Sequence, residues 1–183
     1  MNLWVSDNTT ALSTYGEINT WDVSVITDMN TLFQNKGSFN SDISSWNVSN
    51  VSTMLGMLRG AVSFNQDISS WNVSKVTMFG ATFHNADSFN RDISSWDVSS
   101  ATNMNNMFQE TNNFNQDISG WDISGVTTMN DIFTGADALS DKNKCAIHTK
   151  FSSNANWSYD WSSFCTAGQS ANCLLYTSDA ADE

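Results

Sequence analysis

Basic residues are scarce in this 183-residue chain, which has 7 lysines and arginines against 19 aspartates and glutamates. The net charge of −12 repels nucleic acids and anionic membrane surfaces, because binding to either requires lysine or arginine. No apolar run approaches the roughly 18 residues of a membrane span, and the N-terminus lacks a charged region followed by an apolar stretch. We expect no nucleic-acid partner, no membrane insertion within this sequence and, for a secreted protein, a signal upstream of it.

Residues for catalysis are equally few. The two histidines, His84 and His148, lie in unrelated places, and the sequence contains no HExxH, GxSxG or glycine-rich phosphate loop. Serine is abundant only because a repeated motif carries it. The sequence therefore predicts a protein that is not an enzyme and has no cofactor.

Tryptophan, in contrast, recurs every 25 residues together with the residues around it. A repeat of this length is typical of arrays in which each unit buries its apolar side against its neighbours. The tryptophans occupy an apolar column between isoleucine and valine, which favours core packing over an exposed aromatic platform for sugars. This predicted core ladder consists of Trp21, Trp46, Trp71, Trp96 and Trp121.

The pattern within one unit predicts a strand followed by a helix. Residues 43–48 end in period-two alternation, which is typical of a short strand. Apolar residues within 51–58 are spaced three, three and one apart, which places them on one face of a helix with Ser49 as its N-cap. Thr82 replaces an apolar residue of this face in the third unit, so we expect looser packing there.

The run FNQDISSWNVS at residues 64–74 returns almost unchanged from Phe39, Phe89 and Phe114. It resembles the bacterial surface protein repeat of about 26 residues, found in mycoplasma-type and Listeria-type lipoproteins and grouped with BspA-like leucine-rich repeats. The resemblance covers residues 15–141 and implies an α/β fold, a leucine-rich-repeat-like solenoid of five 25-residue strand–helix units. It also implies a cell-surface or secreted interaction module, with adhesion proposed for relatives.

The repeat pattern divides the chain into four parts. We expect a truncated N-terminal cap at 1–20, the five repeats at 21–140, a C-terminal cap at 141–172 and a non-native tail at 173–183. The tail sequence CLLYTSDAADE resembles a translated sequencing-library adapter, which implies a gene fragment from an environmental sample.

Excluding the tail leaves two cysteines, Cys145 and Cys165. We expect them to form a disulfide bond, as in secreted proteins. The alternative is a pair of buried thiols in a reducing cytosol.

Polar residues flank the tryptophans on what we expect to be an exposed face. This candidate binding face for a glycan or protein ligand consists of Ser45, Asn47, Ser49, Ser70, Asn72, Ser74, Ser95, Asp97 and Ser99. The alternatives are a merely solvated face, a structural surface stalk, or an ice-binding face. The near absence of threonine on this face counts against ice binding.

One aspartate per unit precedes the strand, and such a column would place carboxylates about 5 Å apart. We expect these side chains to cap turns by accepting backbone N–H groups. Calcium binding is the weaker alternative for the column, and no other metal site is expected. The residues are Asp42, Asp67, Asp92 and Asp117.

Overall fold

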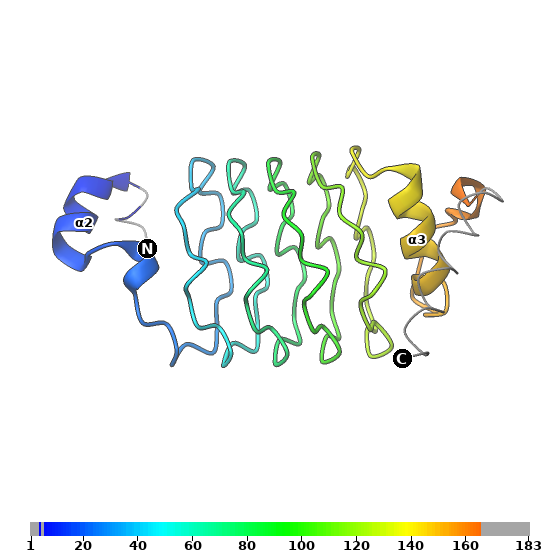
Figure 1. Ribbon diagram of the computed structural model, residues 1–183, viewed down its shortest axis with the longest axis horizontal. Coiled ribbons are helices and arrows are strands. Elements are labelled where there is room, and N and C mark those ends of the chain that lie inside the picture. The colour runs from blue at the N-terminus through cyan, green and yellow to red at the C-terminus, as the bar shows by residue number, and fades with distance from the viewer. Residues whose placement is uncertain (1–3, 5, 166–183) are drawn as a thin grey trace, which may run out of the picture.

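The computed structural model describes Trp4 and residues 6–165. It contains the α-helices α2 (Asn8–Tyr15) and α3 (Asp141–Phe151), and the short 3-10 helices η1 (Ile18–Thr20) and η2 (Ser162–Phe164). Between η1 and α3 the chain winds as a row of irregular coils that lie side by side (Figure 1). We number these coils 1 to 5, and they comprise residues 21–45, 46–70, 71–95, 96–120 and 121–140.

The predicted strand at 43–48 is a pair of turns. Trp46 donates its N–H to the carbonyl of Ile43 at 3.1 Å, and Val51 donates to Val48 at 2.9 Å. Parallel pairing between neighbouring coils is limited to one isolated bridge per interface, at another place in the coil. Within the described residues the bridges join Asp28 to Thr53, Thr53 to Met78, Met78 to Asn103 and Asn103 to Thr128.

Residues 51–58 form successive turns instead of the predicted helix. Met54, Gly56 and Leu58 donate their N–H groups to carbonyls of the next coil at 2.8–2.9 Å, rather than to carbonyls four residues back. Gly56 and Gly60 have left-handed backbone conformations, with φ of 62° and 69°, which interrupt a helical path. The same two coil positions have positive φ elsewhere, at Thr31, Asn35, Ala81, Asn85, Asn106, Glu110, Asp131 and Gly135.

The predicted fold, a leucine-rich-repeat-like solenoid of strand–helix units, is therefore wrong. In the described part of the chain, coils 1 to 5 contain neither a strand nor a helix, and turns make up most of their length. Helices occur only before coil 1 and after coil 5, where α3 begins at Asp141. The tail predicted at 173–183 lies outside the described residues.

Backbone strain at the left-handed positions gives a first expected result. Ala81, at φ 54°, should become more stable by about 0.5–1 kcal/mol when replaced by glycine, which accepts this conformation. Gly60→Ala should destabilise by more than about 1 kcal/mol, because its Cβ would lie 2.7 Å from the Asn35 Oδ1. Urea unfolding of the two variants measures both effects, and a less stable Ala81→Gly or a more stable Gly60→Ala would contradict the assignment of strain.

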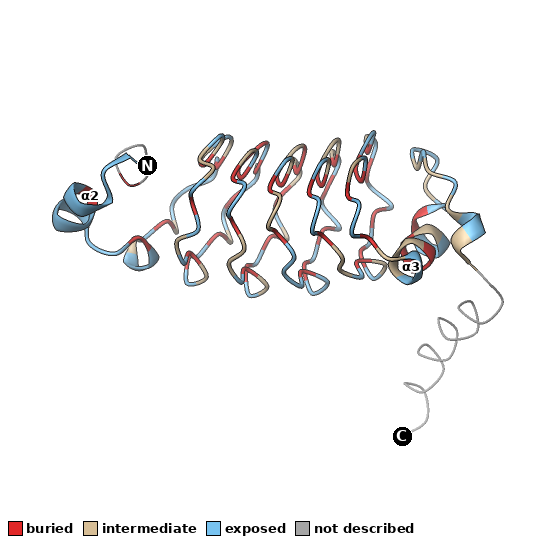
Figure 2. Cartoon of the chain, turned by 90° about the horizontal axis from the view of Figure 1, so that it is seen from above, coloured by how far each residue is buried: buried red, intermediate tan, exposed pale blue. Residues whose placement is uncertain are grey.

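The core runs along the middle of the coils, and buried residues alternate with exposed ones around each coil (Figure 2). Phenylalanine rings stack from coil to coil, with centroids 5.8 Å apart for Phe39 and Phe64 and 6.1 Å apart for Phe64 and Phe89. The tryptophans of coils 2 to 5 are only 3–4% exposed, and each donates Nε1–H to the isoleucine carbonyl 28 residues earlier, as Trp46 does to Ile18.

Trp21 differs from the other four tryptophans, because it is only partly buried. Its Nε1–H donates to the carbonyl of Tyr15, six residues earlier. The reason is that no complete coil precedes coil 1 among the described residues.

Asparagine side chains link the coils in a ladder. The Oδ1 of Asn40 accepts the N–H of Asn65 at 2.9 Å, and the Oδ1 of Asn65 accepts that of Asn90 at 3.1 Å. Asn115 continues the ladder and accepts the N–H of Ser140, the N-cap of α3. The asparagine of the repeated FNQDIS motif therefore holds backbone groups of adjacent coils together.

Thr82, the departure in the third unit, is buried and fully hydrogen-bonded. Its hydroxyl lies within hydrogen-bonding distance of the carbonyls of Phe79, at 2.7 Å, and Met54, at 3.0 Å. A satisfied hydroxyl avoids most of the cost of burying a polar group. The expectation of loose packing at this position is not supported.

The C-terminal end of the stack is capped by α3 and by aromatic residues. Tyr159 accepts the N–H of Phe133 through its hydroxyl at 3.0 Å, and the rings of Trp157, Tyr159 and Trp161 lie 5.5–6.4 Å from that of Phe133. A disulfide joins Cys145 on α3 to Cys165, with Cα atoms 5.0 Å apart, which confirms the predicted pairing. Among the described residues, no helix has the length and apolar character needed to cross a membrane.

Candidate functional site

The predicted binding-face residues recur at the junctions from coil 1 to coil 2, from coil 2 to coil 3 and from coil 3 to coil 4. Asn47, Asn72 and Asp97 are exposed at equivalent places in coils 2, 3 and 4. Each side-chain oxygen, however, accepts the N–H of the serine two residues later, which closes a tight turn. These bonds measure 3.1 Å in all three pairs, Asn47–Ser49, Asn72–Ser74 and Asp97–Ser99.

The first serine of each predicted set also has a structural role. Ser70 and Ser95 donate their hydroxyls to the carbonyls of Ser44 and Ser69 in the preceding coil, at 3.4 and 3.2 Å. Ser45 donates to the carbonyl of Asn19 in the same way. The repeated residues around the tryptophan thus bring polar groups to the surface, but most of these groups already hold the coil in shape.

The aspartate column considered for calcium caps turns as well. Each Oδ1 accepts the N–H of the serine two residues on, at 2.9–3.0 Å, and the pairs are Asp42–Ser44, Asp67–Ser69, Asp92–Ser94 and Asp117–Ser119. The backbone hydrogen bond is the main reason why the pKa of Asp42 and of Asp67 is lowered. In the part of the chain that the structure describes, no three His, Cys, Asp or Glu side chains group to hold a metal ion.

Hydrogen bonds in these turns predict acid sensitivity. The hydroxyl and N–H of Ser99 lower the pKa of Asp97, and those of Ser124 lower the pKa of Asp122. Because the folded pKa lies below the unfolded value of about 3.9, the stabilisation is complete above that pH and is lost as the pH falls through the folded pKa.

We expect the urea midpoint to fall between pH 7 and about pH 2.5 in salt that screens the net negative charge. Asp97→Asn/Asp122→Asn keeps the acceptor oxygens without the titration, so its loss should be smaller. Equal losses in parent and variant would contradict the role of these two turns.

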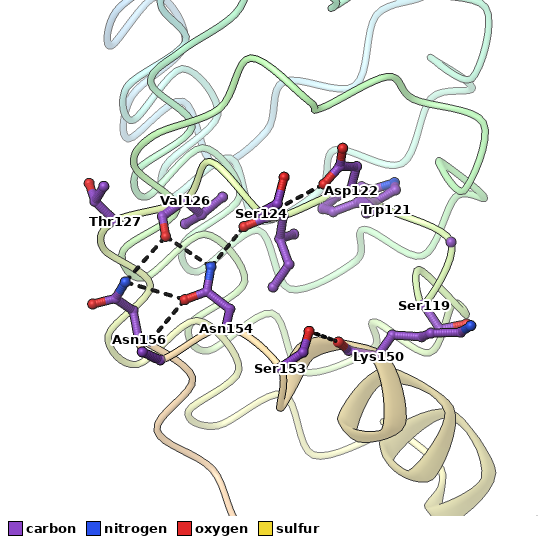
Figure 3. Close-up of a pocket in the computed structure, with 13 residues that line it drawn as sticks. Ser119, Trp121, Asp122, Ser124, Val126, Thr127, Lys150, Ser153, Asn154 and Asn156 are labelled. Atoms are coloured by element: carbon purple, nitrogen blue, oxygen red, sulfur yellow. Dashed lines mark hydrogen bonds between the residues drawn. The ribbon is translucent and has the colours of Figure 1, made fainter.

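The row of turns ends at a groove, where coil 5 meets the loop after α3 (Figure 3). The groove has a volume of about 620 Å³. Trp121, Ile123 and Val126 line it from the core side and are almost fully buried. Asp122 is exposed at the coil position of Asp97, so the groove continues the row of exposed Asx side chains.

Two asparagines of the cap build the opposite wall. Asn154 donates its side-chain amide to the carbonyls of Ile123 at 2.8 Å and Val126 at 3.0 Å. Asn156 donates its amide to Val126 at 3.3 Å and its N–H to the Oδ1 of Asn154 at 2.8 Å (Figure 3). These bonds tie the loop to coil 5 and fix the width of the groove.

The groove combines an apolar floor with polar groups of both charges. Asp122 supplies a carboxylate, Lys150 from the last turn of α3 supplies an ammonium group, and Ser119, Ser124 and Asn156 add hydroxyl and amide groups. Such a surface can form directional hydrogen bonds to a ligand while its apolar part excludes water. Neither histidine lines it.

The histidines are engaged elsewhere. His84 lies 3.9 Å from a carboxylate oxygen of Glu110, and burial lowers its pKa. The Nδ1 of His148 accepts the indole N–H of Trp157 at 3.1 Å.

The sequence pattern pointed to part of this groove and missed the rest. Asp122 belongs to the same coil position as Asn47, Asn72 and Asp97, so extending the row by one unit would have found it. Lys150, Asn154 and Asn156 lie after the last repeat, where no periodic signal marks them. Only the spacing of aromatic residues beyond 140 indicates that this segment packs on the stack.

The stacked coils and their shared motif define a repeat protein. The model of the family described as "Mycoplasma protein of unknown function, DUF285" matches residues 3–101 and 74–167, and the chain belongs to this family. The searches of curated proteins and of solved structures found no match. The family match agrees with the predicted mycoplasma-type repeat, but it gives no support to the predicted leucine-rich repeat or to adhesion.

Proposed function

We propose that this chain is a non-enzymatic interaction module, secreted or displayed at the cell surface, which binds a glycan or protein ligand in the groove between coil 5 and the C-terminal cap. The observation that carries the proposal is the groove itself. It is a hollow where a carboxylate, an ammonium group, hydroxyls and amides gather beside an apolar floor. The repeated polar residues at the surface, in contrast, already form hydrogen bonds within and between the coils.

Two further features support this proposal. The Cys145–Cys165 disulfide is typical of proteins that fold in an oxidising compartment, which favours an extracellular location. No hydroxyl in the groove is paired with a histidine, so the groove lacks the histidine-activated nucleophile of serine hydrolases.

The binding test is a glycan and matrix-protein array with three proteins. Lys150→Glu reverses the charge at the groove and should weaken binding by about tenfold. Lys142→Glu makes the same change at the exposed start of α3, outside the groove, and should bind like the parent. Equal binding by all three proteins would exclude the groove. The lysine substitutions that the predicted face suggests, at Asn47, Asn72 and Asp97, are unsuitable because they would remove three turn caps.

One observation favours ice binding as a second candidate function. A column of hydroxyls has one member per coil, all at least partly exposed, and each member after the first donates to the carbonyl of the preceding one at 3.0–3.3 Å: Thr27, Ser52, Thr77, Thr102 and Thr127. Regularly spaced hydroxyls can order water. A thermal-hysteresis assay on the same three proteins separates the candidates: hysteresis that Lys150→Glu leaves unchanged favours the column, of which only Thr127 lines the groove, whereas ligand binding in the groove depends on Lys150.

A further inference from the structure

The first coil is less covered than the four that follow it. Ile26 is 39% exposed, whereas the residues at the same coil position are at most 2% exposed in Val51, Val76, Ala101 and Val126. Leu32 is likewise partly buried, while Met57 and Met107 at its position are fully buried. In front of coil 1, η1 supplies the carbonyls of Ile18 and Asn19, which contact Trp46 and Ser45. On the side of coil 1 around 26–34, none of the described residues takes the place that a preceding coil would have.

Most main-chain hydrogen bonds between the coils run in one direction along this side; at the first interface the exception is the N–H of Ser52, which donates back to the carbonyl of Thr27 at 2.8 Å. Four N–H groups at alternate residues of each of coils 1 to 4 donate to carbonyls of the next coil, at 2.7–3.0 Å. At the first interface the donors are Met29, Thr31, Phe33 and Asn35, and the acceptors are Thr53, Leu55, Met57 and Arg59. The equivalent carbonyls of coil 1 belong to Asp28, Asn30, Leu32 and Gln34, and none of the described residues donates a hydrogen bond to them.

We call these four carbonyls, with the side chains of Ile26 and Leu32, the N-terminal edge. A groove of about 760 Å³ lies beside it, lined mainly by apolar side chains that include Trp21, Ile26, Met29 and Leu32. Asp22 and Asp28 also line this groove. Aligned carbonyl oxygens and two carboxylates make the edge electronegative, in a chain of net charge −12. The edge therefore favours an occupant that donates N–H groups and carries positive charge.

A second copy of this chain is a poorer source of those donors. Head to head, two N-terminal edges would bring carbonyl oxygens against carbonyl oxygens. Head to tail, the N–H groups would have to come from coil 5, where the hydroxyl of Tyr159 already accepts the N–H of Phe133 and Trp157 and Trp161 pack against its ring. The chemistry of the edge thus favours a different polypeptide.

We propose that the N-terminal edge binds an extended, basic peptide segment of a partner protein. Its N–H groups at alternate residues pair with the carbonyls of Asp28, Asn30, Leu32 and Gln34, and its apolar side chains fill the groove between Ile26 and Leu32. The peptide continues the interface that already joins coil to coil, and so resembles β-strand addition in its use of main-chain hydrogen bonds for affinity. This site is separate from the proposed ligand groove at the other end of the stack.

The chain itself provides a suitable probe. A synthetic peptide of residues 51–61, VSTMLGMLRGA, contains the N–H groups of Met54, Gly56, Leu58 and Gly60 that form this type of interface. It has glycine at both left-handed positions and a positive charge at Arg59. We expect the fluorescently labelled peptide to bind saturably to the full chain in an anisotropy titration. The same peptide methylated on the backbone nitrogens of Met54, Gly56 and Leu58 should bind at least about tenfold more weakly.

Variants of the protein locate the site. Leu32→Lys and Asp28→Lys each place a positive charge on the edge and should weaken peptide binding by about tenfold or more. Val62→Lys makes the matched change at a 40% exposed valine of coil 2, outside the edge, and should leave binding unchanged. Thermal unfolding checks that each variant remains folded. Because there are two edge variants, the test can still be made if one of them does not fold.

Three outcomes would overturn the proposal. They are the absence of saturable binding, binding of the methylated peptide that is as tight as that of the unmethylated peptide, and binding to both edge variants that is as tight as to the parent protein. Concentration-dependent dimers in sedimentation equilibrium that Leu32→Lys dissociates would also overturn it, in favour of a second copy as the occupant. Lys150→Glu should not affect peptide binding, so failure at the N-terminal edge is distinguishable from failure of the proposed function.

Discussion

Replacing Trp71 by alanine is expected to destabilise the protein by about 3–5 kcal/mol. The side chain is 4% exposed and lies in the continuous core between coils, where the loss of an indole leaves a cavity. It also donates Nε1–H to the carbonyl of Ile43 at 3.2 Å, so alanine would leave a buried acceptor without its partner. The free energy of unfolding from urea titration, followed by circular dichroism, measures the loss.

Two controls separate packing from hydrogen bonding. Trp71→Phe keeps most of the apolar contact but lacks the donor, so we expect an intermediate loss of about 1–3 kcal/mol. Lys75→Ala changes an exposed side chain of the same coil and should stay within about 0.5 kcal/mol of the parent. A Trp71→Ala loss of the same size as that of Lys75→Ala would mean that the tryptophan column does not hold the stack together.

The buried columns could be read from the sequence because burial depends on residue type at a fixed repeat position. Trp46 and its three successors, and the Phe64 column, are buried where the repeat places apolar residues. Trp21 departs from this rule. Its burial depends on what lies in front of coil 1, which no repeat position encodes.

The local backbone could not be read in the same way. The spacing of Met54, Met57 and Leu58 fits one face of a helix, but it also fits a series of turns whose N–H groups point to the next coil. The deciding feature is positive φ at two positions per coil. Glycine marks them at Gly56 and Gly60, whereas Thr31, Ala81 and Glu110 take the same conformation without any such mark.

The candidate site was predictable only in part, for a related reason. Asn47, Asn72 and Asp97 are exposed, as their polar character indicates, but the sequence does not say that their oxygens are occupied by backbone N–H groups two residues on. The groove forms where a non-repeating loop meets the last coil. The role of its asparagines follows from the structure alone, in which their side-chain amides donate to the carbonyls of Ile123 and Val126 in coil 5.

Loss of the disulfide is expected to cost about 3 kcal/mol in the chain-entropy model, because the bond closes a loop between residues separated by 20 positions. For a domain of this size, the melting temperature should fall by roughly 6–12 °C. The variant is Cys145→Ser/Cys165→Ser, which avoids a stray thiol. Circular dichroism melting of the parent, of the variant and of the parent in excess dithiothreitol measures the effect.

The loss should begin at the C-terminal cap. Cys165 follows η2, whose Phe164 packs under the Lys144 ammonium group at 4.8 Å, and the preceding aromatic residues cover Phe133. Without the covalent tie, Tyr159 should release the N–H of Phe133, and hydrogen exchange of that amide should accelerate before exchange in coils 2 and 3. Uniform acceleration throughout the stack would instead mean that cap and coils unfold as one unit. An unchanged melting temperature in both the variant and the reduced parent would mean that aromatic packing alone holds the cap in place.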